Sequence, residues 1–283
     1  MEVFLDCLPC MLRQVLEASR LATDRREVHD RIMQEATEIL VGYGEFPNSP
    51  ALASVLHGIV KKHTGVADPY LQVKRANIRD ALAVYPFLQT FLAEQADGLY
   101  WALKAAATGN IIDVAVGSGQ DLRESIEQEL AKPFALCDLA PFQKELATAK
   151  HLLIIADNAG ETVFDRLLME RLSDLTITYA VRGEPVLNDA TVDDVRASGF
   201  APWINVVSTG GRAPGLILDE CTEEFRSLFY QVDLVISKGQ GNYEALMDEA
   251  QRSVFFLLKA KCPMLAEKLS VQVNDYVFKW NGR

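Results

Sequence analysis

The sequence predicts an α/β protein in which a helical N-terminal domain packs on a doubly wound, mainly parallel, Rossmann-like C-terminal domain. Residues 1–108 carry apolar side chains at three- and four-residue spacing, which is typical of amphipathic helices. From residue 151 onward, strand-like and helix-like stretches alternate, which indicates a parallel sheet with crossover helices. We therefore expect a helical domain over 1–108 and an α/β domain over 109–283, with the boundary between 108 and 150.

The first half of the chain divides into helices at turn-forming residues. The apolar periodicity predicts helices over 11–22, 27–40, 50–63 and 86–107. The breaks between them fall in the Gly- and Pro-containing stretches 42–50 and 64–70 and at Pro86, because these residues disfavour a continuing helix.

The second half alternates between short apolar runs and amphipathic segments. The runs predict strands over 110–116, 151–156, 176–181, 204–207, 232–237 and 253–258. The segments between them predict helices over 120–131, 161–172, 189–199, 223–230 and 243–250.

Composition restricts the class of protein. The net charge is −11, from 28 Lys and Arg against 39 Asp and Glu, and the basic residues are scattered, so nucleic acid is not an expected partner. The longest apolar runs, such as 253–258, are too short to cross a bilayer, so no membrane partner is expected. No basic stretch precedes an apolar run near Glu2 and Asp6, and five cysteines do not suggest a disulfide framework. A cytoplasmic protein is expected.

Polar side chains collect where the predicted strands end, which is the edge at which open parallel sheets bind ligands. Asp157 and Asn158 follow one strand, and Asn188 and Asp189 follow the next. Carboxylate and amide oxygens suit Mg²⁺ or Mn²⁺, so Asp157, Asn158 and Asp189 could hold one divalent ion. The alternative is that these residues cap the helices that follow them.

Cations and glycines end the later strands. In the segment SKGQGN, Gly239 and Gly241 would let the backbone approach an anion, and Lys238 would add a positive charge. Lys259 directly follows another apolar strand, and Arg182 follows a third. These residues suggest a phosphate site; the alternatives are a tight turn with a solvated lysine and, for Arg182, a surface arginine.

Two further motifs allow more than one interpretation. The segment 113–121 contains a GxG after a strand-like run, as in nucleotide-binding loops of methyltransferases, but a plain turn explains it better. Cys7 and Cys10 lie three residues apart and could bind a metal or form a redox pair, although buried small side chains explain them equally well.

Several separate motifs resemble the metal-dependent damage-control phosphatases, or ARMT1-like proteins, and the N-terminal CxxC is similar to their prokaryotic branch. The resemblance covers nearly the whole chain and is carried by DCLPC (6–10), DPYLQVKRAN (68–77), GNIID (109–113), ADNAGE (156–161), RGEPVLND (182–189), SKGQGNYE (237–244) and LLKAKCP (257–263).

The resemblance implies a phosphatase that hydrolyses small phosphorylated metabolites with one divalent ion, such as Mn, Co, Ni or Mg. It implies that Asp157, Asn158 and Asp189 bind the metal, that Glu161 faces the substrate, and that Gly160 leaves room for it. The residues that would hold the phosphate are Lys238, Gly239, Gly241, Asn242 and Lys259. The alternatives are an S-adenosylmethionine-dependent carboxyl methyltransferase, a label the family has also carried, and a non-catalytic metal-binding module.

Overall fold

A mainly parallel sheet organises the computed structural model, which describes residues 1–113 and 119–282. Its strands are β1 (Phe134–Cys137), β2 (His151–Ile155), β3 (Thr176–Val181), β4 (Asn205–Ser208), β5 (Leu234–Lys238), β6 (Phe255–Lys259) and β7 (Tyr276–Trp280). The order across the sheet is β1-β7-β6-β5-β2-β3-β4, and every neighbouring pair is parallel except β6 with β7. The predicted fold class is confirmed.

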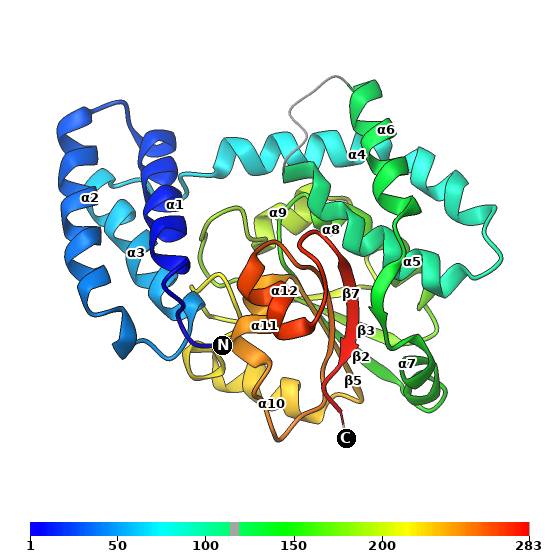
Figure 1. The fold of residues 1–283 in the computed structure, drawn as a ribbon. Coiled ribbons are helices and arrows are strands. Elements are labelled where there is room, and N and C mark those ends of the chain that lie inside the picture. The colour runs from blue at the N-terminus through cyan, green and yellow to red at the C-terminus, as the bar shows by residue number, and fades with distance from the viewer. Residues whose placement is uncertain (114–118, 283) are drawn as a thin grey trace.

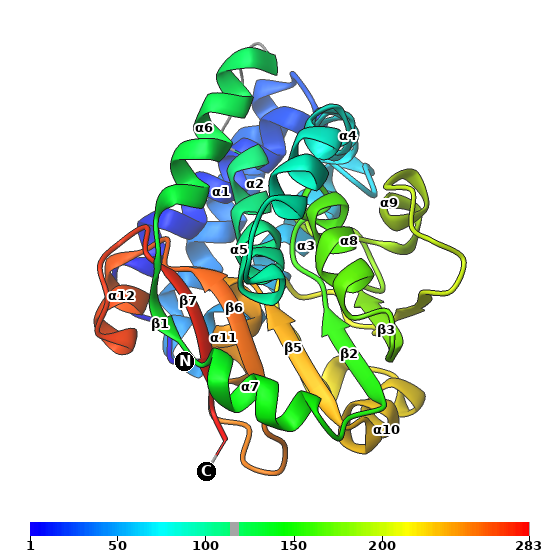
Figure 2. The same cartoon turned by 90° about the vertical axis from the view of Figure 1, so that its right-hand side faces the viewer.

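Helices cover both faces of the sheet, as Figure 1 and Figure 2 show. They are α1 (Cys7–Ala22), α2 (Arg26–Val41), α3 (Ser49–Thr64), α4 (Leu71–Ala93), α5 (Gly98–Thr108), α6 (Gly119–Ala131), α7 (Leu139–Leu146), α8 (Glu161–Arg171), α9 (Val192–Ala197), α10 (Glu223–Gln231), α11 (Gln240–Leu246) and α12 (Pro263–Leu269). Leu103 of α5, Phe142 of α7 and Leu168 of α8 join the core on one face. Phe225 of α10 and Leu265 of α12 join the core on the other. The central strands are apolar on both sides because both sides are covered.

The chain reverses its direction across the sheet between β2 and β5. From β2 it runs outward through β3 to β4, and it then returns to the other side of β2 to form β5 and β6. The carboxyl ends of β2 and β5 therefore border the crevice at which doubly wound sheets bind their ligands.

Helices α1 to α3 form a bundle with its own apolar core, centred on the fully buried Val15, Ile32 and Leu56. The long helix α4 runs from this bundle across to α8 (Figure 1). Leu187, in the loop after β3, packs against the bundle core and adopts a left-handed backbone conformation (φ 47°), which leucine rarely adopts. A loop of the α/β part is thus seated on the N-terminal bundle. The division of the chain into domains at residues 108–150 stays a prediction.

The helix predicted over 86–107, with a break at Pro86, was wrong in both its start and its continuity. Pro86 does not begin a helix but lies inside α4, because Ile78, Val84 and Tyr85 bury against the core around α8 and this burial outweighs the local cost of a proline. The stretch predicted as one helix over 86–107 is divided between α4 and α5, whose first turn is capped by the Asp97 carboxylate (3.0 Å to the Tyr100 N–H).

Other differences involve short elements. Residues 110–113 lie in the 3₁₀ helix η2 (Gly109–Asp113) instead of a strand, and the rest of that predicted strand lies outside the described residues. The short 3₁₀ helices η1 (Tyr43–Glu45) and η3 (Leu218–Glu220), and β1, α7, α12 and β7, were not predicted.

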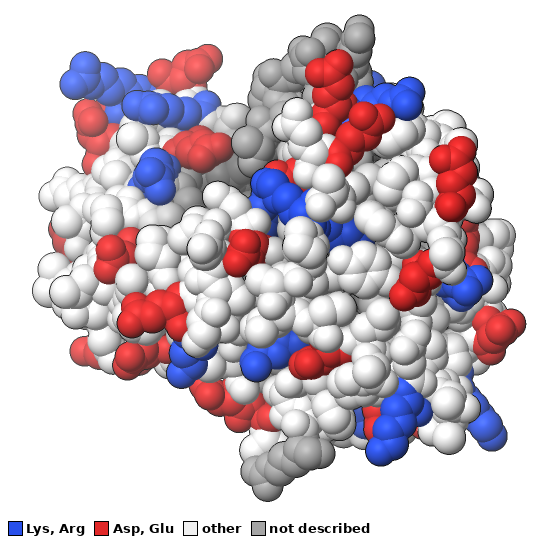
Figure 3. All heavy atoms as spheres, turned by 45° about the vertical axis from the view of Figure 1, so that its right-hand side comes forward, with Lys and Arg blue, Asp and Glu red and all other residues white. Residues whose placement is uncertain are grey.

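The surface and the helix lengths bear on possible partners. Of the helices that the structure describes, none has an apolar stretch long enough to span a membrane. On the face shown in Figure 3, acidic and basic side chains of the described residues are interspersed and the basic ones do not gather into a large patch.

Candidate active site at the carboxyl ends of the strands

The loops that follow β2 and β3 are joined to each other by backbone hydrogen bonds. Asn158 and Asp189 form an isolated antiparallel bridge. The Ala159 N–H donates to the Asn188 carbonyl (2.8 Å), and the Ala190 N–H donates to the Asp157 carbonyl (2.8 Å). The structure thus brings together the loops that carry the three predicted metal ligands.

These residues do not cap the helices that follow, so that alternative is wrong. Helix α8 begins at Glu161 with Gly160 at its N-cap and no side-chain cap. At the start of α9, the Asp194 carboxylate accepts hydrogen bonds from the Thr191 N–H (2.9 Å) and hydroxyl (2.7 Å). Capping therefore does not explain why polar residues stand at 157, 158 and 189.

The Asp157 carboxylate lies against the backbone of Gly239, across the crevice between β2 and β5. A Cβ atom at position 239 would stand 2.1 Å from the Asp157 Cγ, and Gly239 has φ 83°, so only glycine fits there. Among the residues that the structure describes, no group donates a hydrogen bond to this carboxylate. A largely buried carboxylate of this kind requires a cationic partner or a proton.

The electrostatic surroundings of Asp157 are negative. Burial, followed by the charges of Glu161 and Asp189, raises the pKa of Asp157 well above its usual value, while Lys261 and Arg182 act in the opposite direction. Burial also raises the pKa of Asp189, although the neighbouring Arg182 opposes the change. Burial is the first cause of both pKa shifts, and the neighbouring carboxylates add to it.

The charge imbalance can be counted within the described residues. Four buried carboxylates share two buried cations at this edge of the sheet. The carboxylates belong to Asp157, Glu161, Asp165 and Asp189, and the cations to Arg182 and Lys238. Two negative charges are left uncompensated, which a single divalent cation would neutralise.

Arg182 and Asn242 form internal contacts. The Arg182 Nε donates to Asp189 Oδ2 (2.7 Å), and its Nη2 donates to Asn242 Oδ1 (2.9 Å). The Asn242 amide nitrogen donates to the carbonyls of Ala156 (2.9 Å) and Lys238 (2.6 Å). Both side chains are buried, and together they fasten the Asp189 loop to the ends of β2 and β5. Arg182 is not a surface residue, and a phosphate-binding role for either side chain stays a prediction.

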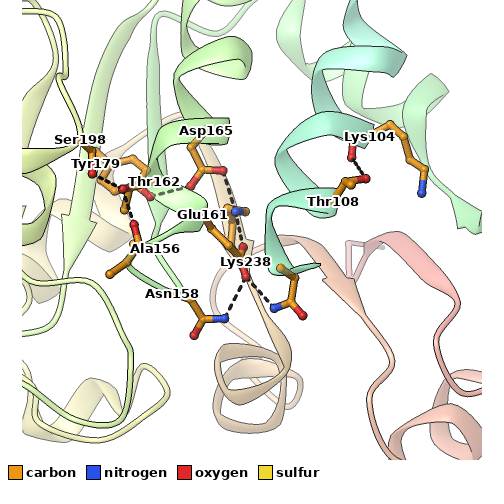
Figure 4. Close-up of polar contacts among 12 residues, drawn as sticks. Lys104, Thr108, Ala156, Asn158, Glu161, Thr162, Asp165, Tyr179, Ser198 and Lys238 are labelled. Atoms are coloured by element: carbon orange, nitrogen blue, oxygen red, sulfur yellow. Dashed lines mark hydrogen bonds and ion pairs between the residues drawn. The ribbon is translucent and has the colours of Figure 1, made fainter. Parts of the chain in front are cut away.

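Lys238 is buried between two carboxylates of α8, as Figure 4 shows. Its Nζ lies 2.6 Å from Glu161 Oε2 and 2.6 Å from Asp165 Oδ1. Glu161 Oε1 accepts hydrogen bonds from the amide nitrogens of Asn158 (3.0 Å) and Asn110 (2.7 Å). The charge predicted to hold the phosphate is therefore paired inside the protein, and Glu161 contacts Asn158 and Lys238.

The remaining predicted phosphate residues are also in contact with the protein itself. The Lys259 Nζ donates to Glu129 Oε2 (2.8 Å), which also accepts the Tyr276 hydroxyl (2.6 Å). A Cβ at Gly241 would lie 1.9 Å from the Pro214 carbonyl oxygen, so this glycine is required by a neighbouring loop. Their role in phosphate binding stays a prediction.

Gly160 does not open a path for substrate. A Cβ atom there would lie 3.0 Å from the Asn77 Cβ and 3.1 Å from the Ile112 Cγ2. The glycine thus allows the close packing of α4 and η2 against the start of α8, and the predicted role was wrong for this steric reason.

Sequence reasoning missed three polar residues of this region. Asp165 follows Glu161 by four residues, a spacing that places both on one face of a helix and that would have shown the pair. Lys261 lies in the LLKAKCP motif beside Lys259; it is exposed, and within the described residues no carboxylate forms an ion pair with it. Asn110 gave no signal of its own in the sequence.

The two other sequence motifs lie apart from these contacts. The Cys7 Sγ is 3.7 Å from the Ser49 Oγ, and the Cys10 Sγ accepts from Arg13 and Gln14. A second site at Cys7 and Cys10 stays a prediction. In the GxG motif at residues 117–119, the first two residues lie outside the described residues, so the methyltransferase alternative stays an expectation from the sequence.

The side chains that could contact a cation at this edge offer oxygen atoms. No group of three or more His, Cys, Asp and Glu side chains arranged for a metal occurs within residues 1–113 and 119–282. A cation here would therefore depend on two carboxylates and the carboxamide of Asn158, with water or substrate oxygens as further ligands. Oxygen donors of this kind suit Mg²⁺ or Mn²⁺.

Comparison with known proteins gives one consistent result. The family model described as the damage-control phosphatase ARMT1-like domain matches residues 3–277. The chain is 34% identical to a damage-control phosphatase of Pyrococcus horikoshii, over 96% of this chain and 95% of that protein. It is 33% identical to an uncharacterised protein of Methanocaldococcus jannaschii, over 96% and 93%. It is 31% identical to a damage-control phosphatase of Archaeoglobus fulgidus, over 96% and 97%.

The fold agrees with these sequence matches. The crystal structure of a DUF89 family protein from Pyrococcus horikoshii superimposes with a TM-score of 0.91 at 32% identity, and the match covers 100% of both chains. The chain therefore belongs to the damage-control phosphatase ARMT1-like family.

Proposed function

We propose that this protein is a divalent-metal-dependent phosphatase that hydrolyses small phosphate monoesters, such as sugar phosphates and phosphorylated or damaged metabolites. Membership of a phosphatase family and two relatives named damage-control phosphatases support a phosphatase enzyme. We further propose Mn, Co, Ni or Mg as the metal.

One observation carries the metal proposal. The Asp157 carboxylate is largely buried at the crevice of the sheet, has no hydrogen-bond donor among the described residues, and lies in a region with two unbalanced negative charges. A divalent cation held by Asp157, Asn158 and Asp189 would remove that imbalance and would polarise a phosphoryl group.

The protein's own residues have separate tasks in this proposal. Asp157 and Asp189 present carboxylate oxygens from two loops that are fixed by backbone hydrogen bonds. Arg182 orients Asp189 through its 2.7 Å contact. Lys261 is the exposed cation whose charge acts on both Asp157 and Asp189, so we assign it the contact with the phosphate oxygens.

The test is phosphatase activity on a panel of phosphate esters, with Mn²⁺, Co²⁺, Ni²⁺ or Mg²⁺ and after chelation. Asp157→Asn is expected to lower turnover by about 100-fold or more, because a ligand of the catalytic cation loses its charge. The same variant is expected to unfold at an equal or higher temperature than the wild type, because it removes a buried carboxylate without a donor.

The matched control is Asp193→Asn, on the exposed first turn of α9, which should keep full activity. Activity that chelation does not change, or an Asp157→Asn enzyme with normal turnover, would contradict the proposal.

A further inference from the structure

A buried chain of charged and polar groups extends from β3 to Asn158 (Figure 4). The Tyr179 hydroxyl donates to Asp165 Oδ2 (2.6 Å), and Asp165 Oδ1 is 2.6 Å from the Lys238 Nζ. Lys238 contacts Glu161 Oε2 (2.6 Å), and Glu161 Oε1 accepts from the Asn158 amide nitrogen (3.0 Å). The chain thus ends on a residue of the proposed metal site.

Lys238 is a buried cation whose charge is paired inside the protein. Its side chain is fully buried, and both of its carboxylate partners are almost fully buried as well. Burial alone would lower the pKa of Lys238, but the charges of Asp165 and Glu161 outweigh burial and raise it. The ammonium group therefore stays charged and holds two carboxylates in fixed positions.

A carboxylate held in this way determines how Asn158 is oriented. Lys238 donates to Glu161 Oε2, so Glu161 Oε1 is the oxygen that accepts an N–H from the neighbouring carboxamides. Asn110 Nδ2 occupies the same Glu161 oxygen as Asn158 Nδ2. The Asn158 nitrogen is thus turned toward Glu161, and its carboxamide oxygen points the other way.

We propose that Lys238 and Asp165 are positioning residues, which hold the Glu161 carboxylate in place so that Asn158 presents its oxygen, and not its nitrogen, to the divalent cation. This inference rests on the proposed function, because it requires Asn158 to be a metal ligand. Groups that orient metal ligands in this way control metal affinity, because a carboxamide turned the other way would present its NH₂ group, and not its oxygen, to the cation. Loss of Lys238 should therefore weaken metal binding more than it weakens substrate binding.

The experiment measures Mn²⁺ affinity without substrate, by electron paramagnetic resonance of free Mn²⁺, on the full chain. Lys238→Met should weaken Mn²⁺ binding by about 10- to 100-fold, the usual effect of losing a group that orients a ligand. Added Mn²⁺ should restore part of its turnover without a matching change in KM. Asp165→Asn keeps the shape of the side chain and should weaken Mn²⁺ binding in the same direction by a smaller factor.

The control is Lys261→Met, which removes a lysine from the same sheet edge. It should raise KM for the phosphate ester and should not weaken Mn²⁺ binding, because Lys261 does not orient the ligands and loss of a nearby positive charge favours a cation. If Lys238→Met does not fold, Asp165→Asn alone decides the question.

Three outcomes separate the hypotheses. Wild-type Mn²⁺ affinity in both Lys238→Met and Asp165→Asn overturns the positioning role. A Lys238→Met enzyme with unchanged Mn²⁺ affinity but a raised KM and weaker inhibition by inorganic phosphate assigns Lys238 to the phosphate instead. A wild-type protein that binds no Mn²⁺ and has chelator-insensitive activity contradicts the proposed function itself.

Discussion

Lys104 of α5 is a buried amine without a partner. Its side chain is fully buried, its Nζ has no hydrogen-bond acceptor among the described residues, and it lies 3.1 Å from the centre of the Tyr276 ring. Burial lowers the pKa of Lys104 from 10.5 to about 7, although the charge of Glu129 opposes the change. We predict that Lys104→Met stabilises the protein.

The magnitude follows from the two pKa values. The difference between 10.5 and about 7 corresponds to about 5 kcal/mol, at about 1.4 kcal/mol for each pKa unit. Relaxation around the amine and its contact with the ring reduce this cost, so we expect Lys104→Met to raise the free energy of unfolding by about 2–4 kcal/mol at pH 7. Methionine has nearly the same length and keeps the apolar contacts.

The gain should depend on pH with a definite sign. Between about 7 and 10.5 the unfolded chain binds a proton at Lys104 that the folded chain has lost, so wild-type stability rises with pH in this window. The advantage of Lys104→Met should therefore shrink as the pH rises from 7 toward 10.

Urea unfolding followed by circular dichroism, at several pH values from 7 to 9.5, measures this difference. Lys144→Met, on the exposed surface of α7, is the control and should change stability by less than about 0.5 kcal/mol. A Lys104→Met protein that is less stable than the wild type, or a gain that is constant with pH, would refute the reasoning.

Two other predictions concern Gly239 and Glu129. Gly239→Ala would place a Cβ atom 2.1 Å from the Asp157 Cγ and should lower turnover by about 100-fold or more. The control is Gly44→Ala, where the new Cβ meets no atom within 4 Å, and it should keep full activity. Equal turnover in the two variants would show that the position of Asp157 does not matter for activity. Burial alone would raise the pKa of Glu129, but hydrogen bonds from Lys132, Lys259 and Tyr276 outweigh it and lower the pKa to about 2. The stability that Glu129 contributes is present above its ordinary pKa of 4.5 and is lost as the pH falls toward 2. In thermal melts, Glu129→Gln should therefore have a lower melting temperature than the wild type at pH 6, and this difference should narrow toward pH 3. A difference in melting temperature that stays constant over this range would contradict the lowered pKa of Glu129.

The sheet and the loops of the site were predictable because they depend on local patterns and one topological rule. The strands that carry Asp157, Arg182 and Lys238 are apolar runs bounded by polar residues. Their carboxyl ends meet because parallel strands share an edge. The pairing of Asn158 with Asp189 agrees with this expectation.

The elements that were missed depend on tertiary contacts that local patterns do not contain. Strand β1 has only four residues, which is too short a run for its periodicity to distinguish a strand from other structure. Pro86 lies inside a helix because the surrounding apolar residues pack on α8, an effect that propensity alone cannot show.

The side chains of the site were harder to predict than its loops. A lysine at a strand end reads equally well as a ligand for phosphate and as an internal cation. Lys238 is an internal cation because Glu161 and Asp165 on α8 pair with it. This pairing depends on how α8 packs near the end of β5, which the sequence does not show. Lys261 was overlooked because it stands beside Lys259 in one motif, and only the fold separates a lysine paired with Glu129 from an exposed one.

Leu187 packs against the core of the N-terminal bundle, so it links the position of the Asp189 loop to the position of that bundle. Only Asn188 separates Leu187, with its left-handed backbone, from Asp189. A tilt of α1–α3 would therefore shift the Asp189 carboxylate. A fragment that kept the sheet but lacked the bundle would leave Leu187 exposed to water and its costly backbone conformation without compensation. Such a fragment could retain every strand and still lose the position of Asp189.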